Sequence, residues 1–285
     1  MLRVLLALAV GALAVGSSAT ASQMIDRNAT NVKLQVNSAG EALLTYSSGG
    51  QVKHVRAWGA VNAVAPAPGR KQVEFSLDYS GGGAFSGQCL PYNGPALAWL
   101  VVACRAPDGS YWALQSWQRM LPDYGVKASA ERAVWELHLS HWTGAIGVLQ
   151  IELDWSYRRF DHLFGTFTYN GGGVYGFAST RYGVPLDSFG RNLYVDAFNS
   201  PLGSGWERDN SFLTHKPKGS FCYGFYPHAG HPAAKGTKYR ATIEGPGVTP
   251  DLMWEGAAPG AYDAATDAAA NLKSSALHDP KCNVG

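Results

Sequence analysis

Alternation of apolar and polar residues, rather than helical periodicity, runs through most of this chain. The segment 32–58 (VKLQVNSAGEALLTYSSGGQVKHVRAW) predicts three short strands separated by turns at 38–40 and 48–50. The same pattern predicts strands at 73–79, 97–103, 111–118, 133–139, 147–154, 162–169, 174–179, 192–198, 220–226, 238–244 and 251–254. Asn170-Gly171 predicts the tightest hairpin, because both residues tolerate positive φ.

Strands of this number and spacing are typical of an antiparallel sandwich or barrel. We expect an all-β fold, a single antiparallel β-sandwich of the jelly-roll or lectin type, over residues 22–285. The alternative is two smaller β-sandwich domains that divide near Gly125. The proline-rich segment 65–69 is either a domain linker or a rigid loop inside one domain, and its short length favours the loop.

One helix is expected near the C-terminus, at about 263–277, where the chain is rich in alanine. Asp263 or Asp267 is placed to cap its first turn, and Pro280 to end it.

The first 21 residues have the organisation of a secretory signal peptide. Arg3 precedes an apolar segment at 4–15, and Ala19-Thr20-Ala21 matches the small residues of a cleavage site. The apolar segment is too short to cross a bilayer, which takes about 20 residues. We therefore expect cleavage after Ala21, a secreted or extracellular/periplasmic location, and a mature chain that is not an integral membrane protein.

The near-neutral charge argues against nucleic acid as a partner, and the four cysteines predict disulfide bonds. With 23 basic and 21 acidic residues and no basic stripe, nucleic acid is not an expected partner. Four cysteines in an exported chain predict two disulfides, for which we favour Cys89–Cys104 and Cys222–Cys282 among the three possible pairings. The cysteines lack the close spacing of a zinc site.

The segment IELDWSYRRF (151–160) raises the question of catalysis, because it holds two carboxylates. On a strand, Glu152 and Asp154 share one face, with Cα atoms about 6.6–6.8 Å apart. That spacing permits the pair of carboxyls used by glycoside hydrolases. The competing interpretation is an ordinary strand with one apolar face and one solvated face.

Three of these residues, Glu152-Leu153-Asp154, resemble the first half of the E-x-D-x-x-E motif of the jelly-roll family of retaining β-glucanases. The resemblance implies a nucleophile at Glu152. Tyr157 stands where that family has the final glutamate, its acid/base, so the implied mechanism lacks its proton donor. The likeness covers three residues and does not assign the chain to the family.

Aromatic residues beside polar ones point instead to sugar binding, because sugar rings combine apolar faces with hydroxyl groups. Trp206 is the preferred stacking platform, because Gly205 and the charged residues after it suggest a loop. The predicted ligand-binding residues are Trp155, Tyr157, Arg191, Asn192, Asp196, Trp206, Glu207 and Asp209.

Other chemistry finds little support in the sequence. No nucleophile elbow, phosphate loop or dinucleotide fingerprint occurs. The histidine pairs His138/His141 and His228/His231, the latter with His215, are interpreted as ordinary imidazoles, and no metal or cofactor is expected. The expected function is extracellular carbohydrate binding. The alternatives are a glycoside hydrolase that uses Glu152 and Asp154, and a structural or interaction protein of the cell surface without catalysis.

Overall fold

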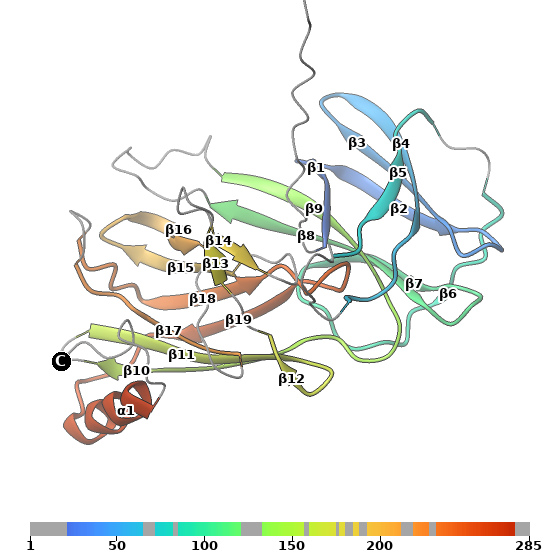
Figure 1. The fold of residues 1–285 in the computed structure, drawn as a ribbon. Helices are drawn as coiled ribbons and strands as arrows, with labels where there is room; N and C mark the ends of the chain where they lie inside the picture. Colours follow the sequence, from blue (N-terminus) through green and yellow to red (C-terminus); the bar gives the residue numbers. More distant parts are fainter. Residues whose placement is uncertain are drawn as a thin grey trace, which may run out of the picture.

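Antiparallel strands and one short helix make up most of the described chain (Figure 1). The structure is a computed structural model, and it describes residues 22–64, 72–81, 85–120, 133–156, 160–174, 177–179, 185–187, 193–211, 219–227 and 232–276. The sheets pack face to face around apolar cores. This confirms the expected all-β, sandwich-type fold.

The first pair of sheets encloses a core of aliphatic side chains from every second strand position, including Leu44, Val55, Leu114 and Leu139. One sheet has the order β2-β3-β4-β5 and the other the order β1-β9-β8-β7-β6. Their bounds are β1 Gln23–Arg27, β2 Thr30–Val36, β3 Ala42–Ser48, β4 Gln51–Gly59, β5 Phe75–Asp78, β6 Leu90–Pro91, β7 Leu100–Arg105, β8 Tyr111–Met120 and β9 Ala133–Trp142.

The second pair of sheets encloses a more aromatic core, which includes Phe167, Phe221 and Tyr239. One sheet has the order β16-β15-β18-β19, and in the other β10, β12 and β17 join β11. Their bounds are β10 Val148–Ser156, β11 Phe160–Tyr169, β12 Gly172–Gly173, β15 Leu193–Ser200, β16 Gly203–Ser211, β17 Ser220–Gly224, β18 Lys238–Ile243 and β19 Leu252–Ala257. The strands β13 Phe177–Ser179 and β14 Pro185–Asp187 form a separate two-stranded sheet.

The two cores follow one another along the chain. The first pair of sheets ends at Trp142 and the second begins at Val148. The segment between β18 and β19 crosses back, because Val248 packs into the first core. The boundary proposed near Gly125 and the proline-rich segment 65–69 lie outside the described residues, as does the predicted signal peptide.

Several local predictions are confirmed. Asn170 and Gly171 have positive φ and join β11 to β12 as a tight hairpin. Helix α1 (Ala264–Ala276) begins next to Asp263, whose side chain accepts a hydrogen bond from the Thr266 amide at 2.6 Å and caps it. The helix packs on β10 (Figure 1). Within the described residues, no helix has the length and apolar character needed to cross a membrane.

The disulfide predictions are confirmed as far as they can be followed. Cys89 and Cys104 are bonded, with Cα atoms 5.4 Å apart, and the bond closes the β6–β7 hairpin. Cys222 is also in a disulfide. Its predicted partner, Cys282, and the predicted helix stop Pro280 lie outside the described residues.

One prediction of local structure is wrong. Trp206 was expected in a loop, but it lies in strand β16, opposite Phe198 of β15. Gly205 and the charged residues after Trp206 suggested a loop because charges are unfavourable in a buried strand. The strand forms because the charge of Arg208 is neutralised by Asp196 on β15.

Candidate functional site

A groove of about 660 Å³ lies beside helix α1, at the edge strand β10. Hydrogen-bonding side chains and aromatic rings both line it. The polar residues are Gln150, Glu152, Thr166, Ser220 and Lys273, and the aromatic ones are Phe164, Phe221 and Trp254. Pockets of this size and mixed lining are typical of small-ligand sites.

Glu152 enters the groove because β10 alternates strictly. Ile151, Leu153 and Trp155 turn toward the protein, while Glu152 and Asp154 share the opposite face. That arrangement is the one that the sequence pattern predicts. Helix α1 covers this face of β10, and beside the helix the Glu152 side chain lines the groove.

Lys273 of helix α1 contacts both carboxylates. Its ammonium forms an ion pair with Glu152, and it lies 3.8 Å from the Asp154 Oδ2 atom. Glu152 raises the pKa of Lys273 above its ordinary value through this hydrogen bond. The Glu152 side chain is 64% exposed, so the ion pair is solvent-screened and easily exchanged for another partner.

The remaining predicted binding residues do not gather at this groove. Trp155 is 5% exposed, with the Lys235 ammonium 4.4 Å from its ring centre. Glu207 is buried and Asp209 is partly buried on β16. Tyr157, Arg191 and Asn192 lie outside the described residues.

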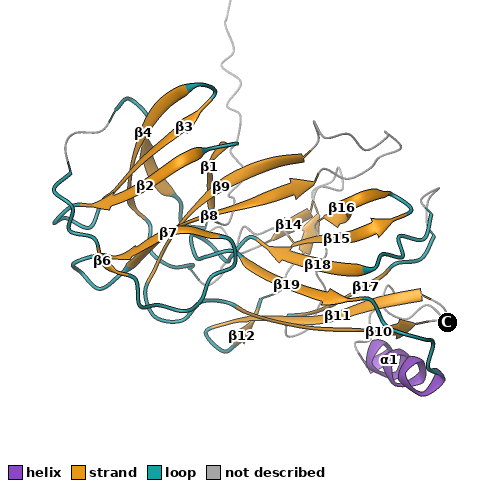
Figure 2. Cartoon of the chain, turned by 180° about the vertical axis from the view of Figure 1, so that it is seen from behind, coloured by secondary structure: helices purple, strands orange, loops and turns teal. Residues whose placement is uncertain are grey.

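Asp196 lies in a different place, a buried polar layer between two sheets, and the half-buried Trp206 contacts the Arg240 side chain of this layer. We call this layer the seam; it is formed by Trp117, Glu136 and His138 on one side and Tyr194, Asp196, Arg208, Arg240 and Glu244 on the other. The sheet that contains β8 and β9 lies over the sheet that contains β15 and β18 in both views (Figures 1 and 2). The rings of Trp117 and Tyr194 are 5.9 Å apart across it.

Asp196 is fully buried and bridges two arginines in the seam. Arg208 pairs with its Oδ1 atom, and Arg240 donates to its Oδ2 atom at 2.8 Å. The Trp206 ring centre lies 4.6 Å from the Arg240 guanidinium. These contacts pair charges that would otherwise be costly inside the protein. Among the described residues, the Nη1 and Nη2 atoms of Arg208 have no hydrogen-bond partner.

His138 is the centre of a second buried cluster at the end of the seam. Its Nδ1 atom lies 3.0 Å from the Ser22 hydroxyl and 3.3 Å from the Asp251 Oδ2 atom, and its Nε2 atom lies 3.4 Å from the Glu136 Oε2 atom. Burial alone would lower the pKa of His138, but Asp251, Glu136 and Glu244 outweigh it and raise that pKa to about 9.

His138 and His141 face opposite ways, as their spacing on a strand predicts. His141 turns into the first core, where it stacks on Trp112 with ring centres 3.8 Å apart. Its Nδ1 atom lies 2.7 Å from the Ala60 carbonyl oxygen and its Nε2 atom 2.8 Å from the Ser110 hydroxyl. Burial lowers the pKa of His141 to about 4, so His141 is a neutral core residue at pH 7. The other histidines considered, His215, His228 and His231, lie outside the described residues.

Sequence reasoning missed most residues of both sites. Nothing local links Ser22, Glu136, Glu244 and Asp251, which come from widely separated segments. One signal was present: Glu136 and His138 are two apart on a strand and therefore share a face. In the groove, Trp254 and Lys273 are brought to β10 only by the packing of β19 and α1.

Comparisons with known proteins assign no family to this arrangement. No protein-family model, no curated protein and no solved structure matches the chain.

Proposed function

We propose that this chain is an exported protein that binds carbohydrate in the groove beside helix α1. The observation that supports the proposal is the lining of the groove, in which carboxylate, amide, hydroxyl and ammonium groups lie next to aromatic rings. Sugar hydroxyls both donate and accept hydrogen bonds, and the groove offers both kinds of partner. The partly exposed ring of Trp254 offers apolar surface for one face of a sugar ring, while Phe164 and Phe221 form the buried floor behind it.

Glu152 is the residue that we assign to sugar hydroxyls. Its carboxylate is largely exposed and is held by one lysine. Exchanging part of an exposed ion pair for a sugar hydroxyl costs little, because such pairs contribute about 0–1 kcal/mol. A hydrogen bond to a charged group then contributes about 1.5–3 kcal/mol.

The export part of the proposal draws on the predicted signal peptide and on the disulfides. Ser22, the predicted first residue of the mature chain, is fully buried, and its backbone nitrogen donates to the Gly247 carbonyl oxygen at 2.8 Å. Two cysteine positions that were expected to oxidise, Cys89 and Cys104, are bonded. Disulfides persist in oxidising compartments.

A glycoside hydrolase is the second candidate, and the position of Glu152 in the groove favours it. Hydrolysis needs a second carboxyl that acts on the same bond. Asp154 shares the face and the lysine.

Binding and hydrolysis are tested together on a panel of polysaccharides with the purified mature protein. We expect binding to at least one glycan and an affinity about tenfold lower for Glu152→Gln, since about 1.4 kcal/mol corresponds to a factor of ten. Glu255→Gln is the matched control, because Glu255 is a partly exposed carboxylate outside the groove, paired with Lys238 on a neighbouring strand. It should bind as the wild type does.

The outcomes separate the three classes of function. If Glu152→Gln binds glycan as strongly as Glu255→Gln and the wild type do, the groove is not the binding site. Release of reducing ends by the wild type, lost in both Glu152→Gln and Asp154→Asn, would favour the hydrolase. Absence of binding and of release across the panel would favour a structural or interaction protein.

A further inference from the structure

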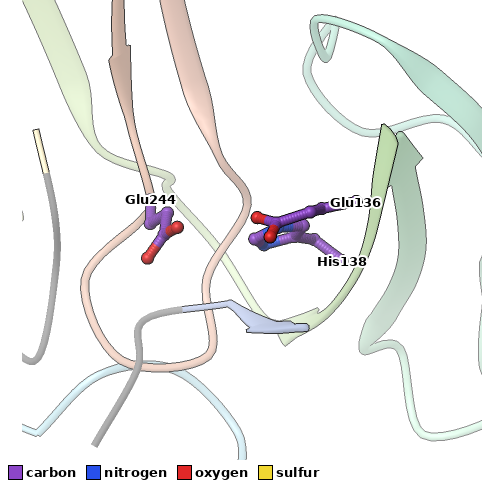
Figure 3. A group of neighbouring side chains, drawn as sticks. All are labelled: Glu136, His138 and Glu244. Atoms are coloured by element: carbon purple, nitrogen blue, oxygen red, sulfur yellow. The ribbon is translucent and has the colours of Figure 1, made fainter. Parts of the chain in front are cut away.

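The cluster around His138 joins the two halves of the molecule. Glu136 and His138 project from β9, and Glu244 lies just after the end of β18 and points toward them (Figure 3). All three side chains are buried, and one ligand atom from each lies within 4.8 Å of the others. Carboxylate oxygen and imidazole nitrogen are the usual non-sulfur ligands of divalent transition metals.

The spacing of Glu136 and His138 suits shared coordination better than direct pairing. Charge-assisted hydrogen bonds between nitrogen and oxygen span about 2.7–2.9 Å. Here the Nε2 and Oε2 atoms are 3.4 Å apart. Two ligands that each lie about 2.1 Å from one tetrahedral ion are separated by about 3.4 Å.

Contacts around the cluster orient its ligand atoms. Asp251 and the Ser22 hydroxyl engage the Nδ1 side of His138, which leaves Nε2 directed at Glu136. A carboxylate behind the imidazole is the usual support of a metal-binding histidine. Asp251 is itself fixed by the Trp117 indole, at 2.7 Å. The Arg27 guanidinium lies 3.1 Å from the Oε1 atom of Glu136, and the Oε2 atom of Glu136 faces His138.

Two buried hydroxyl groups lie on the same strand faces as the cluster. Ser140 is two residues from His138 on β9, and Thr242 is two residues from Glu244 and paired with Tyr194. Strand alternation therefore places both hydroxyls on the faces that line the seam. Both residues are fully buried, and among the described residues neither hydroxyl has a hydrogen-bond partner. Buried hydroxyls of this kind are normally bonded to water or to a bound species.

We propose that Glu136, His138 and Glu244 bind one divalent transition-metal ion of the zinc type, which links the two sandwich halves. The ion completes its coordination with water, for which Ser140 and Thr242 provide hydrogen-bonding partners. The role is structural, because the site is buried between sheets and its ligands come from both halves. This metal site is distinct from the groove and does not depend on carbohydrate binding.

The test measures metal content and metal-dependent stability of the purified mature protein. After dialysis against Zn²⁺ and removal of free ion, we expect one zinc per chain and a melting temperature at least 5 °C above that of protein treated with a chelator. Glu244→Gln keeps the size of the side chain but removes the charged ligand, so it should bind zinc at least tenfold more weakly and lose the chelator effect. Asp267→Asn, a buried carboxylate on helix α1, is the control and should retain both properties.

A second measurement needs no variant. X-ray absorption at the zinc edge should show nitrogen and oxygen ligands that include one imidazole, without sulfur. The proposal would be overturned if the wild-type protein held no zinc, or if chelator left its melting temperature unchanged. A protonated His138 among carboxylates would then account for the cluster. Zinc bound through sulfur, or retained fully by Glu244→Gln, would overturn it as well.

Discussion

At the scale of single residues, the neighbours of a buried side chain decide its chemistry more than its residue type does. His138 and His141 are three apart in sequence, yet the pKa of the first is raised to about 9 and that of the second lowered to about 4. Both are buried. At His138 the carboxylates of Asp251, Glu136 and Glu244 outweigh the effect of burial, while at His141 burial outweighs the attraction of Asp108.

The neutral state of His141 predicts acid sensitivity. Because its folded pKa is about 4 and its unfolded pKa about 6.5, the unfolded chain binds the proton first as pH falls. Stability is therefore retained above pH 6.5 and lost below it, by about 2 kcal/mol from this residue between pH 7 and pH 5. Urea denaturation at the two pH values should show this loss in the wild type and a smaller one in His141→Gln. An equal loss in both proteins would contradict the assignment.

At the scale of elements, strand alternation predicted faces well but not neighbours. The alternation of β10 placed Ile151 and Leu153 inward and Glu152 outward. It gave no indication that α1 would bring Lys273 to the same face. The hairpin turn at Asn170 and the helix cap at Asp263 could also be predicted from the sequence, because each depends on backbone conformation within a few residues.

The Cys89–Cys104 bond predicts the stability of one hairpin. It closes a loop of 15 residues next to the first core. A loop of about that length gains roughly 3 kcal/mol from its crosslink. The double variant Cys89→Ala/Cys104→Ala should lose about that much free energy of unfolding in guanidinium titrations. A loss below about 1 kcal/mol would mean that the hairpin is held without the bond.

At the scale of the whole molecule, a polar layer joins two apolar cores. The seam buries Asp196, Arg208 and Arg240, which pair with one another within the sheet of β15, β16 and β18. The Arg240 guanidinium also donates to the Gln118 carbonyl oxygen of the facing sheet at 3.5 Å. This hydrogen bond and the contact between the Trp117 and Tyr194 rings link the two halves across the seam.

The seam predicts cooperative unfolding of both halves. Asp196→Asn removes the charge that two buried arginines share and should lower stability by about 3–5 kcal/mol. In the wild type, tryptophan fluorescence and far-ultraviolet circular dichroism should change in one coincident transition. Two separated transitions in the wild type would show that each core unfolds by itself.

The sequence alone determined the all-β class, most strand positions, the tight hairpin, the capped helix and the Cys89–Cys104 bond. Each depends on residues close in sequence or on a local conformational preference. Only the tertiary structure decided that Glu152 meets Lys273, that Trp206 lies in a strand, and that His138 meets Glu244 and Asp251. Some of these contacts join segments about a hundred residues apart in sequence, and others neutralise charges that would be unfavourable in an isolated buried strand. The packing of sheets brings such groups together, and it produces no periodic pattern in the sequence from which the contacts could be predicted.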